Sequence, residues 1–369
     1  MKKSKIFVLG FLVCYTALLL ANLLTPDKVM SDEENRYLAE APEWSLKAFF
    51  AGNFDTDFET YVSDQFVGRT ELVKLSVEVD HLLVRKEGNG VYYGPNGFLV
   101  EAFQELNKEQ WAKNMGYLEA FSAWCEKELG QAPTIMLVPT VSHVLPNLVA
   151  DGAPEVNQET LFAEAAAKLP GFFDVTDALR EHGDEYIYYR TDHHWTSLGA
   201  FYAYQAMKEG DADLEDYETW ALSKDFLGTT YKKVLRRVTP DWLMAMYPKS
   251  IQNLKLIYNM GMEERDTYYD ESFLGGKDQY STYLGGNKPL IQMNTGVENG
   301  KKLLLIKDSY ANCFAQFLLE DYEEIYMVDL RHFNYSMQSF AKEQGITDVL
   351  VLYNVKGFSE EVSLFWVSK

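Results

Sequence analysis

Continuous apolar runs, each able to form a short strand, recur along the last two-thirds of the chain. They cover residues 134–138, 186–189, 303–306, 325–328 and 349–352. Segments of helical period accompany them near residues 105–129, 197–208 and 311–319. Strands that are apolar on both faces and alternate with helices are typical of a parallel sheet that helices cover on both sides. The pattern therefore predicts an α/β domain.

The segment between about residues 211 and 300 interrupts this alternation. It is acidic, rich in glycine and without a clear period, which predicts an irregular insertion or cap. Earlier in the chain, apolar residues at helical spacing begin near residue 49, and a Pro-Asn-Gly turn at 95–97 separates two short strand-like runs. We therefore expect one large domain over residues 46–369, with the insertion inside it.

Residues 1–24 have the composition of a membrane-spanning segment. Lysines at positions 2, 3 and 5 precede an uncharged run, residues 6–24, that is long enough to cross most of the ~30 Å hydrocarbon core of a bilayer. Positive charge before the run predicts that the rest of the chain lies outside the cytoplasmic membrane. The residues before Pro26 lack the small-residue pair of a signal-cleavage site, which favours an uncleaved single-pass anchor over a secreted protein. Polar residues 25–45 predict a tether.

The charge and composition of the chain exclude some classes of function. A formal net charge of −21 excludes broad nucleic-acid binding, because neutralising phosphates requires an excess of lysine and arginine. Acidic clusters such as Glu263, Glu264 and Asp266 predict a solvated face, and they lack the alternating ligand spacing of a calcium loop. The sequence predicts neither a cofactor nor a resident metal ion.

The first candidate for chemistry is Thr-Asp-His-His-Trp at residues 191–195. In an extended segment, Asp192 and His194 would point to one side and His193 to the other. Asp192 could then bind one imidazole nitrogen of His194 and leave the other free as a base. Capping of the following helix is the structural alternative. Metal binding by Asp192, His193 and His194 is a weaker one, because neighbouring residues do not easily face one ion.

The second candidate is Ser309, which follows the apolar run 303–306 and precedes a predicted helix. Ligands of open α/β sheets bind at this edge, and amides of the helix's first turn could stabilise an oxyanion. A serine needs a base to become a nucleophile, although Asp308 and Ser309 alone could equally be a helix cap. Taken with the first loop, the pattern predicts a triad of nucleophile Ser309, base His194 and orienting Asp192.

Further residues near these strand ends are candidates for substrate or oxyanion binding. Arg331 could hold an anionic or hydroxyl-rich ligand, and the amide of Asn354 could donate to an oxyanion. A surface ion pair or a simple turn is the alternative for each of them. Tyr310, Trp195 and His193 adjoin the predicted triad and complete the set of candidates.

These motifs together resemble a known family. Thr-Asp-His-His-Trp at 191–195, Leu-Leu-Leu-Ile-Lys-Asp-Ser-Tyr-Ala-Asn at 303–312 and Val-Asp-Leu-Arg at 328–331 resemble the DHHW-motif proteins. Those proteins are similar to the AlgX/AlgJ-type SGNH-hydrolase-like domains that O-acetylate bacterial exopolysaccharides. Residues 64–69 and Leu-Gly-Gly-Asn at 284–287 also look familial, so the resemblance covers nearly all of the chain after residue 24.

The resemblance implies an SGNH-hydrolase-like, flavodoxin-like fold and the triad Ser309, His194 and Asp192, with the Asp-His pair before the serine. One departure is Lys307, which stands where a Gly-Asp-Ser signature has glycine. The implied function is an extracytoplasmic O-acetyltransferase that moves an acetyl group to a polysaccharide hydroxyl through an acyl-serine. A membrane-bound O-acyltransferase partner would be the acetyl source. A carbohydrate acetylesterase with the same triad and a noncatalytic glycan-binding component of an export complex are the alternatives.

Overall fold

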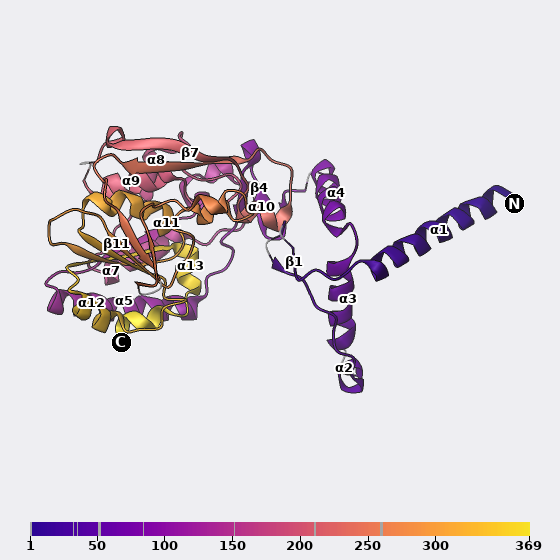
Figure 1. Ribbon diagram of the computed structural model, residues 1–369, viewed down its shortest axis with the longest axis horizontal. Coiled ribbons are helices and arrows are strands. Elements are labelled where there is room, and N and C mark those ends of the chain that lie inside the picture. Colours follow the sequence, from indigo (N-terminus) through magenta and orange to yellow (C-terminus); the bar gives the residue numbers. More distant parts are fainter. Residues whose placement is uncertain are drawn as a thin grey trace. The chain divides into compact units, whose positions relative to one another are not determined.

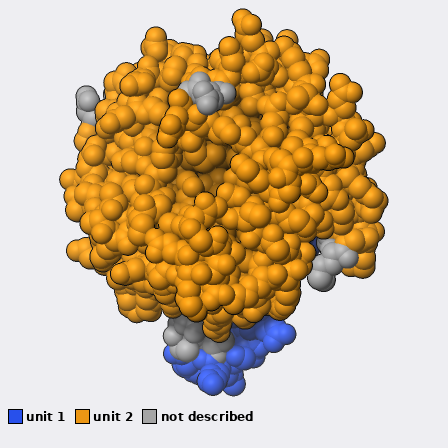
Figure 2. All heavy atoms as spheres, turned by 90° about the vertical axis from the view of Figure 1, so that its left-hand side faces the viewer, with its two compact units in different colours: residues 1–88, 231–237 blue, residues 89–230, 238–369 orange. Residues whose placement is uncertain are grey.

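The computed structural model describes residues 2–369 except positions 32, 35, 51, 52, 84, 151, 210, 211, 259 and 260. Asp211, where the predicted insertion starts, therefore lies outside the described residues. The chain divides into two compact units, one of residues 1–88 with 231–237 and the other of residues 89–230 with 238–369 (Figure 2). Residues 46–88 fall in the first unit.

The first unit is mainly helical. Its elements are α1 (Lys2–Leu24), β1 (Met30–Ser31), β2 (Arg36–Tyr37), α2 (Leu46–Phe50), α3 (Asn53–Gln65), α4 (Arg69–Leu82) and β3 (Glu87–Gly88). Within α1, residues Lys5–Leu24 are long and apolar enough to cross a membrane, with a mean hydropathy of 2.3. By length and composition, α1 could be an anchor or a signal sequence.

An ion-pair network joins the segment 25–45 to the helices of this unit. Arg36 donates two hydrogen bonds to the buried carboxylate of Asp64 in α3, at 2.8 and 2.6 Å, and the amide of Ala39 donates a third at 3.0 Å. The Arg36 guanidinium lowers the pKa of Asp64 to about 2. The side-chain amide of Gln65 accepts a hydrogen bond from the backbone N–H of Lys28 and donates one to the carbonyl of Lys28. The predicted tether is thus bound to α3.

A mixed seven-stranded sheet forms the centre of the second unit, with strand order β10-β9-β11-β13-β12-β14-β6. The strands are β6 (Thr134–Val138), β9 (Lys255–Tyr258), β10 (Glu263–Arg265), β11 (Leu290–Asn294), β12 (Lys302–Lys307), β13 (Glu324–Val328) and β14 (Asp348–Asn354). The four strands β13, β12, β14 and β6 are parallel, as the apolar runs predict. The other three are antiparallel.

Helices cover both faces of this sheet (Figure 1). Along β12, Leu303 and Leu305 point into one buried cluster, and Leu304 and Ile306 point into the other, which is why the strand is apolar throughout. One cluster includes residues of α5 (Lys108–Glu128), α7 (Gln158–Lys168), α12 (Met337–Gln344) and α13 (Val355–Glu360). The other includes residues of α8 (Thr176–Glu181), α9 (Ser197–Met207) and α11 (Ala311–Phe314), which continues as a 3-10 helix over Ala315–Glu320.

Smaller elements complete this unit. Strands β4 (Val91–Tyr93) and β5 (Leu99–Glu101) pair across the Pro-Asn-Gly turn, as predicted. Among the described residues, the other α-helices are the short α6 (Val141–Val144) and α10 (Thr229–Val234). Only the first two residues of α10 belong to this unit.

Two predictions about strands are wrong. The segment 211–300 is not wholly irregular, because it supplies β9, β10 and β11 to the main sheet and a long hairpin of β7 (Tyr217–Phe226) and β8 (Asp241–Pro248). Residues 186–189 do not form a sheet strand. Tyr188 instead makes an isolated bridge to Trp195 across a tight loop, and residues 187–189 are apolar because their side chains fill the core.

Candidate active site

The loop 190–196 is bent and not extended, and the bend brings Asp192 and His194 together. The amide of His194 donates to Asp192 Oδ1 at 3.0 Å, which closes a turn in which the carboxylate binds the backbone two residues on. Trp195 is fully buried, and its indole N–H donates to the carbonyl of Tyr310 at 3.0 Å. The loop is thereby fastened to the turn that carries Ser309.

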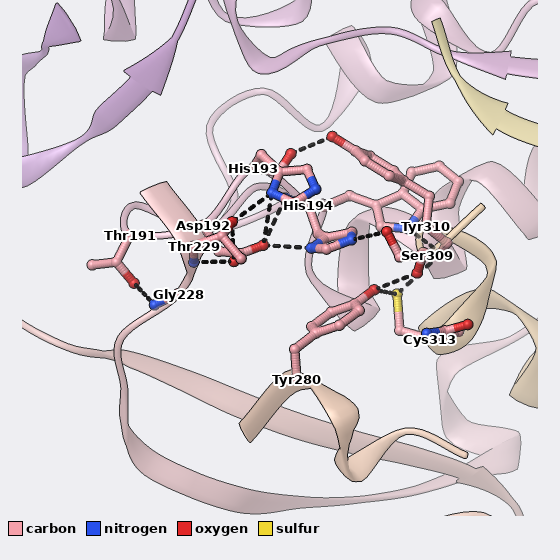
Figure 3. Close-up of polar contacts among 12 residues, drawn as sticks. Thr191, Asp192, His193, His194, Gly228, Thr229, Tyr280, Ser309, Tyr310 and Cys313 are labelled. Carbon is pink, nitrogen blue, oxygen red and sulfur yellow. Dashed lines mark hydrogen bonds and ion pairs between the residues drawn. The ribbon is translucent and has the colours of Figure 1, made fainter. Parts of the chain in front are cut away.

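Ser309, His194 and Asp192 form one hydrogen-bonded chain (Figure 3). Ser309 Oγ lies 2.7 Å from His194 Nε2, and His194 Nδ1 lies 2.5 Å from Asp192 Oδ1. Ser309 stands between the end of β12 and the start of α11 and is half-buried, whereas His194 and Asp192 are buried. The arrangement allows the imidazole to take the serine proton while the carboxylate holds the ring.

The backbone after β7 supports the Asp192 carboxylate. Thr229 donates to Asp192 Oδ2 through its amide at 2.7 Å and its hydroxyl at 3.0 Å. Burial opposes the charge of Asp192, but His194, His193 and the Thr229 amide outweigh it and hold the pKa of Asp192 below its usual range. Gly228 allows this approach, since a Cβ there would lie 2.3 Å from Asp192 Oδ2. The carboxylate is therefore an ionised, fixed acceptor.

Two supporting residues carry no sequence signal and were not predicted. The ring of Tyr280 stacks on His194, with centroids 3.9 Å apart and planes 9° apart, and its hydroxyl donates to the carbonyl of Ser309 at 3.1 Å. Asp241, which is fully buried, accepts from the amide and the hydroxyl of Thr191 at 2.8 and 2.7 Å. Tyr280 restrains the imidazole of His194, and Asp241 fixes the position of Thr191, which precedes Asp192.

Three of the predicted binding residues hold the fold instead. Asn354 Nδ2 donates to the carbonyl of Val138 at 3.1 Å, and its Oδ1 caps α13, so the structure gives this amide a role other than the predicted oxyanion donor. Trp195 is fully buried, and Tyr310 is 2% exposed and donates its hydroxyl to the carbonyl of His193. These two rings cannot contact a glycan as placed, and they position the loops.

The other two predicted binding residues remain accessible. Arg331 makes a two-point ion pair with the buried Asp329, at 2.8 and 2.6 Å, while 40% of its side chain is exposed. The ring of His193 is 38% exposed, and its Nδ1 lies 2.6 Å from the hydroxyl of Thr229. A substrate role for either residue stays a prediction.

The same loop also contains the residues of the metal-ligand alternative. Ligand atoms of Asp192, His193 and His194 all lie within 4.8 Å of one another. However, both ring nitrogens of His194 are within hydrogen-bond distance of a protein group, one of Asp192 and the other of Ser309. The geometry therefore fits proton transfer along the chain better than ligation of an ion.

Two family models match this chain, and they indicate a likeness to DHHW and SGNH-hydrolase-like proteins. The family model of the DHHW protein matches residues 164–328, and that of the SGNH hydrolase-like domain of acetyltransferase AlgX matches residues 101–219. The chain is 27% identical over 188 residues to the probable alginate O-acetylase AlgJ of Pseudomonas syringae pv. tomato. That match covers 44% of this chain and 47% of AlgJ, so the chain spans about half the length of this curated relative.

Solved structures agree with these matches. A DHHW family protein from Eubacterium siraeum is 26% identical with a TM-score of 0.63, over 76% of this chain and 95% of that one. PatB1 of Bacillus cereus is 18% identical with a TM-score of 0.63, over 74% of this chain and 98% of that one, and shares the fold. The predicted resemblance to DHHW and AlgX/AlgJ-type proteins is confirmed, as is the predicted fold class.

Proposed function

We propose that the protein is an extracytoplasmic O-acetyltransferase that moves an acetyl group to a cell-surface or exopolysaccharide hydroxyl through an acyl-Ser309 intermediate. The observation that carries the proposal is the hydrogen-bonded chain from Asp192 through His194 to the half-buried Ser309. The similarity to the AlgX domain and to a probable alginate O-acetylase supports the choice of acetyl transfer.

The proposed reaction has two halves. Ser309 Oγ attacks the acetyl carbonyl of the donor and gives its proton to His194 Nε2, while Asp192 accepts a hydrogen bond from Nδ1–H and stabilises the imidazolium. The donor's leaving group departs with the proton from His194, which leaves acetyl-Ser309. An acceptor hydroxyl then loses its proton to His194 Nε2 and attacks the acetyl carbonyl, which forms the new ester and frees Ser309.

The acceptor and the acetyl source follow from the same proposal. A polysaccharide supplies the acceptor hydroxyl, and a membrane-bound O-acyltransferase supplies the acetyl group. Anchoring through residues 6–24 would hold the protein beside such a partner, and α1 has the length and composition for it.

Mass spectrometry of the full-length chain in detergent tests this proposal. Incubation with 4-nitrophenyl acetate is expected to place one acetyl group on Ser309 in the wild type, and none in Ser309→Ala. Ser250→Ala, a change of an exposed serine outside the site, is the matched control. Acetate release by Ser309→Ala at the wild-type rate would refute the proposal.

An added oligosaccharide separates transfer from hydrolysis. Acetyl groups on the sugar that depend on Ser309 support the transferase. Release of acetate at a rate that the sugar leaves unchanged supports the carbohydrate esterase. Sugar binding that survives Ser309→Ala, with no ester turnover in the wild type, supports the noncatalytic component.

A further inference from the structure

The imidazole of His194 lies between two other rings (Figure 3). The ring of Tyr280 is nearly parallel to it, with centroids 3.9 Å apart and planes 9° apart, so the two rings meet face to face. The ring of His193 lies on the opposite side, with its centroid also 3.9 Å away and its plane tilted by 36°. The reaction proposed above makes His194 a cation in each of its halves, and the face of Tyr280 then borders that cation.

Tyr280 is fixed in this position by contacts on its other sides. It lies in a short 3-10 helix and is buried. The rings of Phe226 and Tyr283 pack against it, with centroids 6.5 and 5.3 Å away. Its hydroxyl donates to the carbonyl of Ser309 at 3.1 Å. The ring is therefore held beside His194 before a substrate binds, and it needs no reorganisation when the charge forms.

The surroundings of Tyr280 favour attraction between its ring and a positive charge. Burial raises the pKa of Tyr280 well above its usual range, so the side chain stays a neutral phenol. The faces of such a ring carry partial negative charge and its edge carries partial positive charge. A cation over the face is attracted, most strongly where both groups are removed from water. His194 and Tyr280 are both buried, which meets this condition.

The contact with Tyr280 does not compete with the hydrogen bonds of His194. Asp192 and Ser309 approach the edge of the imidazole, at Nδ1 and Nε2, at 2.5 and 2.7 Å. Tyr280 covers a face of the same ring and uses neither nitrogen. The carboxylate of Asp192 and the face of Tyr280 can therefore stabilise one imidazolium at the same time.

We infer that Tyr280 is a positioning residue that acts through His194, because the face of its ring stabilises the imidazolium that forms in each half of the reaction. The hydrogen bond from its hydroxyl to the carbonyl of Ser309 keeps that face in place. The inference rests on the proposed function of Ser309. On this inference Tyr280 changes the rates of both halves through one residue, His194.

A series of full-length proteins with modified rings at position 280 tests the inference. The first member is Tyr280→Phe, and the others carry phenylalanine with one, two or three fluorine atoms on the ring. Fluorine withdraws electron density from the face of the ring while the ring changes little in size, so the series weakens the attraction and keeps the packing. The measurement is the single-turnover rate at which 4-nitrophenyl acetate acetylates Ser309.

The rate is expected to fall with each added fluorine, by about 10- to 30-fold over the series and with KM little changed. Tyr280→Phe itself is expected to stay within about fivefold of the wild type, because only one hydrogen bond is lost. Tyr280→Leu, which has no ring, is expected to be at least about tenfold slower than Tyr280→Phe. The control is Tyr326→Leu, since Tyr326 is as buried as Tyr280 but lies in the other core cluster.

Equal rates across the fluorinated series would overturn the inference, because a ring that only fills space predicts no such trend. If Ser309→Ala is inactive while the series is flat, the proposed function stands and the inference fails. If the wild type does not react with the ester, acetyl transfer fails, and labelling of Ser309 by phenylmethylsulfonyl fluoride becomes the readout. Labelling that slows along the series would then support the inference, and equal labelling would overturn it. A wild-type chain that reacts with neither reagent overturns both proposals.

Discussion

The substitution Gly228→Ala tests how closely the orientation of Asp192 controls the site. A Cβ at position 228 would lie 2.2 Å from Asp192 Cβ and 2.3 Å from its Oδ2, whereas ordinary contacts begin near 3.4 Å. Asp192 must therefore move by about 1 Å, or the chain at 228 must, and Thr229 would move with it. Either change disturbs the carboxylate that holds His194.

The size of the effect follows from that displacement. A shift of about 1 Å in groups that position a reaction costs roughly 10²-fold in rate, which is ~2.7 kcal/mol of transition-state stabilisation. This displacement would most disturb the hydrogen bond from His194 Nδ1 to Asp192 Oδ1, which is 2.5 Å long. Without it the imidazole loses both its orientation and the charge that stabilises its protonated form.

The assay is the rate of Ser309 acetylation by 4-nitrophenyl acetate, with the melting temperature measured alongside. Gly116→Ala is the matched control, because that glycine lies within α5 and a Cβ there would meet nothing within 4 Å. We expect this control to keep the wild-type rate and to gain up to about 1 kcal/mol of stability from the better helix former. A folded Gly228→Ala protein whose rate is within threefold of the wild type would refute the reasoning.

Two further predictions concern acid stability and metal ions. Asp64→Asn is expected to weaken α3 by about 2 kcal/mol at pH 7, because Arg36 holds the pKa of Asp64 near 2 in the folded chain, below the 3.8 of an unperturbed side chain. In the wild type this stability is present above about pH 4 and is lost as the pH falls toward 2. Hydrogen exchange of the α3 amides, corrected for intrinsic rates, measures both the effect of Asp64→Asn and its dependence on pH. Equal protection of variant and wild type at pH 7 would contradict this prediction. A strong chelator is expected to leave the acetylation rate unchanged, since the ring nitrogens of His194 face Asp192 and Ser309. A loss that added Zn²⁺ restores would favour the metal alternative.

The parallel half of the sheet was predictable from the sequence, and the antiparallel half was not. Strands such as β12 and β14 are buried on both faces, so they are continuous apolar runs that stand out from their surroundings. Strand β11 alternates between buried and half-buried positions over only five residues, and β9 is shorter still. Such short alternation does not distinguish a strand from a loop until its partners are known.

The candidate triad was predictable because its residues lie in two compact motifs. The residues that support it were not, since Tyr280, Thr229 and Asp241 come from a segment with no motif and reach the site only through tertiary packing. Residues 186–189 show the opposite error: a hydrophobic run indicates burial, and burial alone does not specify a strand. Lys307 could be recognised as a departure, but its partner Asn287 is visible only in the structure.

The order of strands in the sheet differs from the order in which they are synthesised. His194 and Ser309 are 115 residues apart along the chain, and β12, which leads into Ser309, lies between β13 and β14, both of which are made after it. In a growing chain, β12 therefore lacks one of its two neighbouring strands, and Asp308 lacks its hydrogen bond from the Asn354 amide, until residues 348–354 have been added. A shortened chain that ends before β14 would still contain both sequence motifs, yet it would lack the strand that pairs with β12 and β6 and binds the turn before Ser309.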